Sequence, residues 1–165
     1  MGVLAGVSVG EYLHSSFPGH DREFRDGALV ARSMPDYLHG KTQALLIALF
    51  MALRKRLCLY PCSETRMMIR ADRFLISDVA VFHLSEPGLL PDTPPLVAIE
   101  ILSPDDRLSE VRDKLEEYQA WGVPHVWLVD PHSRRFYLCE AGLREMQVLR
   151  IAELGVEVTP DQVFE

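Results

Sequence analysis

A stretch near the middle of the sequence, Leu96–Leu102, is apolar at every position except Glu100. A loop with four prolines, Leu84–Pro95, precedes it, and Ser103 and Pro104 follow it. Short apolar runs bounded by such turn residues are typical of a central strand that is covered on both faces. The fold class that we predict is therefore α/β, with a mixed central sheet flanked by helices.

The spacing of apolar residues assigns the other helices and strands. Apolar side chains recur at helical intervals over Tyr37–Leu57 and over Asp106–Trp121, which predicts two long helices. Asp26 and Gly27 predict the turn of a hairpin. Its strands would be Arg22–Arg25 and Ala28–Ala31, and further strands are expected at 65–69, 78–82, 125–129, 135–139, 146–151 and 156–158. A short N-terminal helix should begin at the capping box of Ser8 and Glu11 and end by Phe17-Pro18-Gly19.

Length and composition fit one domain, which we assign to residues 1–165. A chain of 165 residues that is 48% apolar can bury a core without disulfides or structural metal. The longest apolar run, Ala44–Leu53, is about half as long as a membrane-spanning helix requires. The first residues lack the basic and hydrophobic parts of a signal peptide. We therefore expect a cytoplasmic protein with no membrane contact, whose three cysteines are reduced.

The charge balance restricts the partners. With 24 acidic and 17 basic residues, the net charge is −7. A field of this sign repels polyanions, which argues against a protein that coats nucleic acid passively. An enzyme that acts on phosphodiesters remains compatible with this charge, because it needs positive charge only along its cleft and a bound divalent cation can add to it.

Three ionisable side chains lie where buried chemistry is expected. Glu100 has aliphatic neighbours, and burying its carboxylate is costly unless a partner or a metal compensates it. Asp78 opens the preceding strand, and two neighbouring carboxylates favour a divalent cation between them. Lys114 lies at the edge of a helical apolar stripe and can reach inward. Purely structural roles stay open for all three: a strand-end glutamate that reaches water or arginine, a turn aspartate, and a lysine paired to glutamates on the helix surface.

Six segments of the sequence carry a family resemblance. They are REFRDG (22–27), LHGK (38–41), SDVAVF (77–82), VAIEILSPDD (97–106), EVRDKLEEY (110–118) and GVPHVWLVDP (122–131). In order and spacing they resemble the Uma-type family of restriction-endonuclease-like proteins, in the PD-(D/E)XK nuclease superfamily. The resemblance implies a restriction-endonuclease-like fold, with an N-terminal hairpin and extra C-terminal strands around the central sheet.

The resemblance assigns roles to the two acidic residues on strands. Asp78 matches the aspartate of the PD element, with Ser77 in place of the usual proline. Glu100 matches the acidic residue of the (D/E)XK element. Leu102 stands where the superfamily pattern has lysine, as is common in Uma-type sequences.

Other matched residues complete the implied site. Lys114 and Tyr118 resemble a helix-borne Lys/Gln-x-x-x-Tyr element, so Lys114 would supply the missing ammonium group. Glu23 matches the glutamate of the family's E-x-x-x-G hairpin and would add an acidic group. Tyr118 would support Lys114, contact a phosphate or simply pack in the core. His39 matches a family histidine near the cleft, although a packing role at the helix end is equally compatible.

The implied activity is that of a metal-dependent endonuclease that hydrolyses phosphodiester bonds of DNA, with RNA not excluded. Asp78, Glu100 and the carbonyl of Ile101 would bind Mg²⁺ or Mn²⁺. Lys114 would orient the attacking water or stabilise charge on the phosphate. Leu102 and the acidic net charge motivate an alternative, a catalytically inactive nucleic-acid-binding or regulatory module on a nuclease scaffold.

The substrate surface and the oligomeric state complete the expectations. Candidate substrate-binding residues are His39, Arg73, Arg107 and Tyr118. We predict a local positive cleft lined by Arg70, Arg73, Arg107 and Lys114, with Glu116 and Glu117 pointing away. A homodimer fits the family and the strands expected after Cys139, which can pair across a two-fold axis.

Overall fold

The computed structural model of the protein describes residues 4–16 and 22–165. In this part of the chain one mixed sheet of nine strands forms the centre of the molecule. Its strands are β1 (Leu4–Ala5), β2 (Arg22–Arg25), β3 (Ala28–Ala31), β4 (Leu59–Arg70), β5 (Arg73–His83), β6 (Val97–Ile101), β7 (His125–Asp130), β8 (Arg135–Cys139) and β9 (Leu143–Met146). The order in space is β1-β3-β2-β5-β6-β7-β8-β9, and β4 pairs with β5 along the other edge of that strand.

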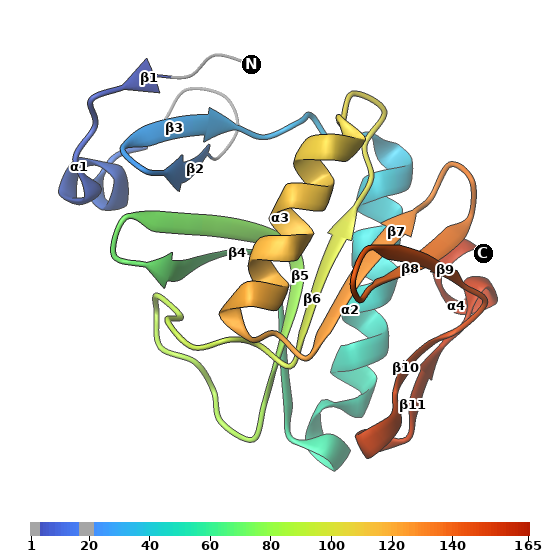
Figure 1. The fold of residues 1–165 in the computed structure, drawn as a ribbon. Helices are drawn as coiled ribbons and strands as arrows, with labels where there is room; N and C mark the ends of the chain where they lie inside the picture. The colour runs from blue at the N-terminus through green and yellow to red at the C-terminus, as the bar shows by residue number, and fades with distance from the viewer. Residues whose placement is uncertain (1–3, 17–21) are drawn as a thin grey trace.

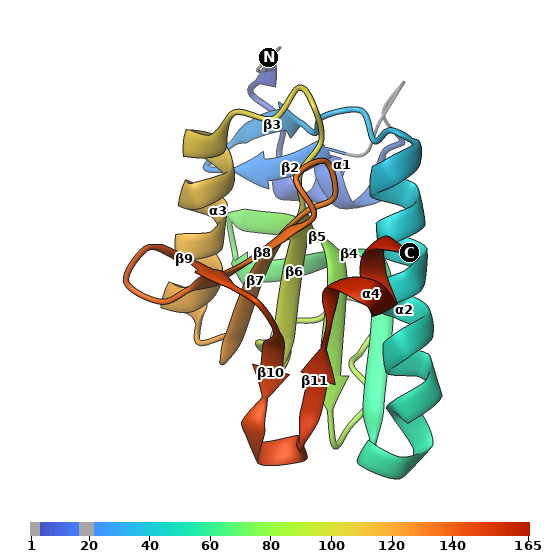
Figure 2. The same cartoon turned by 90° about the vertical axis from the view of Figure 1, so that its right-hand side faces the viewer.

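Helices cover both faces of this sheet. The helices are α1 (Val9–His14), α2 (Tyr37–Leu57), α3 (Leu108–Trp121) and α4 (Pro160–Phe164). In Figures 1 and 2, α3 lies on one face, while α2 and the short α4 lie on the other. A small second sheet of β10 (Leu149–Ile151) and β11 (Val156–Val158), joined by the 3-10 turn η1 (Ala152–Leu154), packs on the α2 side through its apolar residues.

Strand β6 is the central strand that the apolar run predicts. All five of its residues are buried, and it pairs antiparallel with β5 and parallel with β7. Its odd-numbered residues face the core under α2, and Ala98 belongs to the core under α3. Glu100 is on the same side of the strand as Ala98 because side chains alternate along a strand. The fold is thus the predicted mixed α/β sheet with a core on each side.

Several predicted boundaries are confirmed, and others are wrong. The hairpin strands and the helix at Tyr37–Leu57 agree residue for residue, and the capping box of Ser8 and Glu11 is present. Helix α1 ends at His14, and the predicted stop at 17–19 lies outside the described residues. Helix α3 starts two residues later than predicted because Asp106 caps the preceding turn, accepting a hydrogen bond from the Ser103 N–H at 2.7 Å.

The largest corrections concern strands. β4 and β5 are much longer than the predicted 65–69 and 78–82, because they form one long antiparallel hairpin. Asp78 therefore lies in the middle of β5 and does not open it. The segment predicted as one strand at 146–151 divides between β9 and β10, which belong to different sheets, and α4 was not predicted.

A membrane-spanning helix is not among these elements: within 4–16 and 22–165, every helix is too short or too polar to cross a bilayer.

Candidate active site

A cleft of about 330 Å³ opens on the α3 side of the sheet, at the end where the β2–β3 hairpin joins it. Its walls come from β2 and β3, the loop after β3, the start of α2, strands β5 and β6, and the first half of α3. Segments far apart in the sequence therefore meet there. Asp78, Glu100, Lys114, Glu23 and His39 all line this cleft, as does Ile101.

Asp78 and Glu100 lie on neighbouring strands, as predicted. Val79 of β5 pairs with Ile99 of β6 in an antiparallel register, so Asp78, just before Val79, lies opposite Glu100, just after Ile99, and both are on the α3 side of the sheet. The two residues are 2% and 7% exposed. Asp78 is fixed by its Oδ2, which accepts a hydrogen bond from the Ile101 N–H at 2.7 Å.

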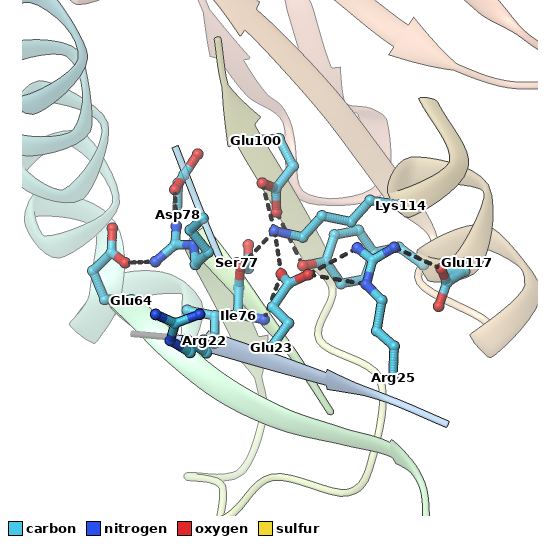
Figure 3. A network of polar contacts seen from close by, with 12 residues as sticks. Arg22, Glu23, Arg25, Glu64, Ile76, Ser77, Asp78, Glu100, Lys114 and Glu117 are labelled. Atoms are coloured by element: carbon cyan, nitrogen blue, oxygen red, sulfur yellow. Dashed lines mark hydrogen bonds and ion pairs between the residues drawn. The ribbon is translucent and has the colours of Figure 1, made fainter. Parts of the chain in front are cut away.

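Lys114 extends from α3 into this cleft. Its ammonium donates to Oε2 of Glu100 at 2.8 Å and to the carbonyl of Ile76 at 2.7 Å, and it lies 2.7 Å from Oε1 of Glu23 (Figure 3). An ammonium has three donors, so each has an acceptor here. The prediction that Lys114 reaches inward is confirmed, and pairing on the helix surface does not occur.

Glu23 holds Lys114 from the hairpin side. Its Oε1 also accepts from the Ile76 N–H at 3.1 Å, and its Oε2 accepts from Nε and Nη2 of Arg25 at 3.2 and 2.8 Å. Each oxygen of Glu23 therefore has two protein donors, which together use the roughly four lone-pair sites of a carboxylate, whereas each oxygen of Glu100 has only one among the described residues. This geometry suits a residue that positions Lys114 better than a metal ligand.

Tyr118 lies one turn after Lys114 and is fully buried. Its hydroxyl donates to Oε1 of Glu100 at 3.0 Å, so Lys114 and Tyr118 hold the two oxygens of the same carboxylate. Tyr118 is not among the residues that line the cleft. The structure therefore gives it a supporting role, and it does not bring the hydroxyl to a position where it could contact a phosphate.

The three buried carboxyl groups have very different proton affinities. Burial raises the pKa of Glu100 to about 8, although the Lys114 charge opposes the change. Burial likewise raises the pKa of Asp78 to about 6 against the attraction of Arg32. For Glu23, burial is outweighed by Lys114 and Arg25, which lower its pKa to about 2. Glu23 is thus ionised throughout the neutral range. Asp78 and Glu100 bind protons more readily, and additional positive charge in the cleft would stabilise their ionised forms.

A second cluster of polar side chains lies next to Asp78, at the N-terminal end of α2. His39 is 5% exposed, its Nδ1 lies 3.0 Å from Oγ of Ser103, and its Nε2 lies 3.6 Å from Oδ1 of Asp78. Burial lowers the pKa of this imidazole below its usual value, so it is neutral. Among the described residues no hydrogen-bond partner satisfies Nε2. This nitrogen is therefore available to a ligand.

Glu64 and Arg32 complete this second cluster. The guanidinium of Arg32 bridges Asp78 and Glu64, one nitrogen on each carboxylate. One ligand atom each from His39, Glu64 and Asp78 lies within 4.8 Å of the others. The sequence did not point to Arg32 or Glu64, because neither belongs to a segment of the resemblance.

Comparison with known proteins agrees with this geometry. The sequence model of the Uma2 family, described as "Putative restriction endonuclease", matches residues 9–165. The chain belongs to the Uma2 family. It is also similar to a crystal structure described as "a putative nuclease belonging to DUF820" from Anabaena variabilis ATCC 29413, with a TM-score of 0.82 and 18% sequence identity over 96% of this chain and 98% of that chain. At this identity the likeness shows the fold, which is restriction-endonuclease-like. Comparison with curated proteins gives no match.

In this Uma2-family chain, the donor set fits a divalent cation. Asp78 and Glu100 offer carboxylate oxygens, the ligands that Mg²⁺ and Mn²⁺ prefer. Nε2 of His39, which has no hydrogen-bond partner among the described residues, lies 3.6 Å from Oδ1 of Asp78. The fit therefore rests on a buried donor atom that the described protein residues leave unused, beside two carboxylates with raised pKa values.

The predicted positive wall of the cleft is partly wrong. Arg107 lines the cleft, as predicted, and is 72% exposed at its side chain. Arg70 and Arg73 do not line it. They lie at the far turn of the β4–β5 hairpin, where both bind Asp26 of the neighbouring hairpin turn. Arg73 also binds Glu117, Nε to Oε2, at 2.7 Å.

Two other arginines take their place. Arg25 and Arg32 line the cleft, each paired with a carboxylate of the site. Glu117 was expected to point away, but it faces the hairpin and lies 3.7 Å from Nη1 of Arg25. These pairings depend on how the hairpins align in space, which sequence spacing alone does not reveal.

Proposed function

We propose that the protein is a Mg²⁺- or Mn²⁺-dependent endonuclease that hydrolyses phosphodiester bonds of DNA. The observation that carries this proposal is the ammonium of Lys114, 2.8 Å from Glu100 in the cleft that Asp78 also lines. Leu102 cannot supply the amino group of the nuclease pattern. A helix one element further along the chain delivers an equivalent group to the same carboxylate.

Asp78, Glu100 and the carbonyl of Ile101 would hold the cation, with Nε2 of His39 as a further donor. When bound, such a cation polarises the phosphate and lowers the pKa of a water molecule. Asp78 and Glu100 must be ionised in that state. Because burial raises both pKa values, a bound cation would stabilise the ionised forms of both groups.

Lys114 would act on the phosphate itself. One of its three N–H groups would turn from its present acceptor to a non-bridging oxygen or to the attacking water. Glu23, ionised by its low pKa, keeps Lys114 charged and in the cleft during this change. Arg107, at the open side of the cleft, would bind a neighbouring phosphate of the strand.

The proposal extends to the setting of the enzyme. The free thiols Cys58, Cys62 and Cys139 suit the reducing cytoplasm. RNA stays open as a second substrate, because no described feature selects the sugar. A homodimer would form along β9, which ends the sheet order and whose outer edge pairs with no strand in the described part of the chain.

The test combines cleavage of supercoiled and linear DNA with Mn²⁺ titration by calorimetry. We expect wild type to cut with Mn²⁺ or Mg²⁺ and Glu100→Ala to lose both cleavage and Mn²⁺ binding. Lys114→Ala should keep Mn²⁺ binding and lower cleavage by about two orders of magnitude, the scale of losing one electrostatic stabiliser. Lys55→Ala, an exposed lysine on α2, is the control and should change neither.

The alternative function is a binding module that no longer cuts. Leu102 motivates it, and it predicts DNA binding without cleavage by wild type under any divalent cation. Cleavage by wild type that disappears in Glu100→Ala would exclude it. Unchanged cleavage in Lys114→Ala would remove the observation on which the enzyme proposal depends.

A further inference from the structure

We propose that, in the metal-free protein, the guanidinium of Arg32 binds the oxygen of Asp78 that would bind a metal. When a divalent cation binds there, Arg32 moves to a phosphate of the substrate. This inference rests on the proposed metal-dependent function and adds a residue that couples metal binding to substrate binding. It starts from the position of the guanidinium between Asp78 and Glu64.

The two oxygens of Asp78 are used differently. Oδ2 is held by the Ile101 N–H of the neighbouring strand and is part of the sheet. Oδ1 faces the cleft, where Arg32 binds it and Nε2 of His39 lies 3.6 Å away. A metal that uses Asp78 must therefore bind at Oδ1. Arg32 and the metal compete for the same oxygen, because two cations on one oxygen repel each other.

Glu64 shows that the guanidinium lies in a prepared position. Glu64 lies on β4 opposite Asp78. Its φ is 50°, a left-handed backbone conformation that is unfavourable for residues other than glycine. Gln43 of α2 fixes it further, donating to Oε1 of Glu64 at 2.7 Å and to the Asp78 carbonyl at 2.8 Å. Strand and helix thus hold a second carboxylate where Arg32 needs one.

Arg32 can leave this position without disturbing the core. It is the first residue of the loop between β3 and α2, outside any strand or helix. Its side chain lines the cleft and retains 17% exposure. Once a divalent cation compensates Asp78, the guanidinium is left with the half-exposed Glu64. A phosphate entering the cleft then offers two non-bridging oxygens, which the planar guanidinium can bind with two hydrogen bonds.

The experiment measures metal and DNA binding separately, in Arg32→Gln and in Arg70→Gln. Arg70 undergoes the same loss of charge but lies outside the cleft and is 59% exposed at its side chain. We expect Arg32→Gln to bind Mn²⁺ at least about tenfold more tightly than wild type in calorimetry, because a neighbouring arginine weakens competing cation binding to a carboxylate on that scale. Arg70→Gln should match wild type.

The same variant should bind DNA more weakly. With Ca²⁺ at saturating concentration to suppress cleavage, fluorescence anisotropy should show a loss of affinity for Arg32→Gln. The slope of log K against log salt should decrease by about one, the value for one lost phosphate contact. A merely structural arginine would give a different pattern, in which its removal weakens metal and DNA binding together.

Arg32→Lys keeps the protein measurable should Arg32→Gln fold poorly. Lysine preserves the charge but cannot bridge two carboxylates as a planar fork, so Mn²⁺ affinity should lie between those of wild type and Arg32→Gln. Mn²⁺ affinity at or below that of wild type in these variants would overturn the role of Arg32 and leave the nuclease proposal intact. Absence of Mn²⁺ binding in wild type and all variants would overturn the metal-dependent function, and this inference with it.

Discussion

At the residue scale, the central feature of the cleft is the buried carboxylate of Glu100. Its strand is otherwise apolar, so the charge has to be compensated by side chains from elsewhere. Lys114 and Tyr118 bind one oxygen each, and they lie one turn apart on the same face of α3. The helix thus supplies the compensation that the strand lacks.

Glu23 provides the test of this arrangement. Glu23→Gln keeps the shape but places an amide beside Arg25 or Lys114, which leaves a buried cation without its partner. We expect a loss of about 3 kcal/mol in the free energy of unfolding near pH 7. Urea denaturation from pH 3 to pH 7 measures it, with Glu116→Gln on the exposed side of α3 as the control.

The advantage of wild type over Glu23→Gln should depend on pH with a definite sign. The pKa of Glu23 is lowered in the folded state to about 2 from the ordinary value of 4.5. The stabilisation is therefore fully present above pH 4.5 and is lost as the pH falls towards 2. A difference that stays constant, or grows, below pH 4.5 would contradict the ion pair of Glu23 with Lys114.

Sequence reasoning identified the centre of the site but not its surroundings. Periodicity placed Asp78 and Glu100 on neighbouring strands and Lys114 at the inner edge of a helix, and the family resemblance favoured a shared site over separate structural roles. Arg32 and Glu64 were not predictable, because they meet only through the register of β4 against β5 and the course of a loop. Pairings of this kind are properties of the folded chain.

At the element scale, the β2–β3 hairpin determines whether the site is complete. It brings Glu23 and Arg25 to Lys114, and its position depends on a two-residue turn. Asp26 and Gly27 have φ values of 51° and 84°, which is the left-handed geometry that matches the twist of the two strands. This element was predictable to the residue, since Asp-Gly between two short strands is a strong signal for a two-residue hairpin turn.

Gly27→Ala and Gly40→Ala form a matched pair. An added Cβ has no neighbour within 4 Å at either position, so only the backbone conformation differs. Gly27→Ala should destabilise the protein by about 1–2 kcal/mol because of its positive φ. Gly40→Ala, inside α2, should stabilise it by up to about 1 kcal/mol. Thermal and urea unfolding measure both, and equal effects of the two substitutions would contradict the assigned turn.

Longer elements were harder to delimit than the hairpin. β5 extends well before Asp78 because β4 pairs with it as far as Arg73, and the burial of 73–77 depends on that pairing and on the hairpin. The apolar pattern alone cannot show it. In contrast, the apolar spacing over Tyr37–Leu57 was sufficient to delimit α2, and the structure adds the Asp36 cap at its start and the left-handed Cys58 at its end.

For the whole molecule, charge determines when nucleic acid can bind. The net charge of −7 repels DNA. Positive charge in the cleft is largely committed to the protein's own carboxylates: Lys114 to Glu23 and Glu100, Arg25 to Glu23, and Arg32 to Asp78. The metal-free cleft therefore has little free positive charge to offer a phosphate.

DNA binding should consequently require a divalent cation. We expect anisotropy to show DNA binding at least about tenfold tighter with Ca²⁺ than with EDTA at equal ionic strength. The bound Ca²⁺ adds positive charge and releases the guanidinium of Arg32, and both attract the phosphates. Asp78→Asn should reverse part of this pattern. It removes a metal ligand and frees Arg32 at once, so affinity in EDTA should rise while the gain from Ca²⁺ becomes smaller. Equally tight binding by wild type with EDTA and with Ca²⁺ would show that DNA is held by surfaces away from the cleft.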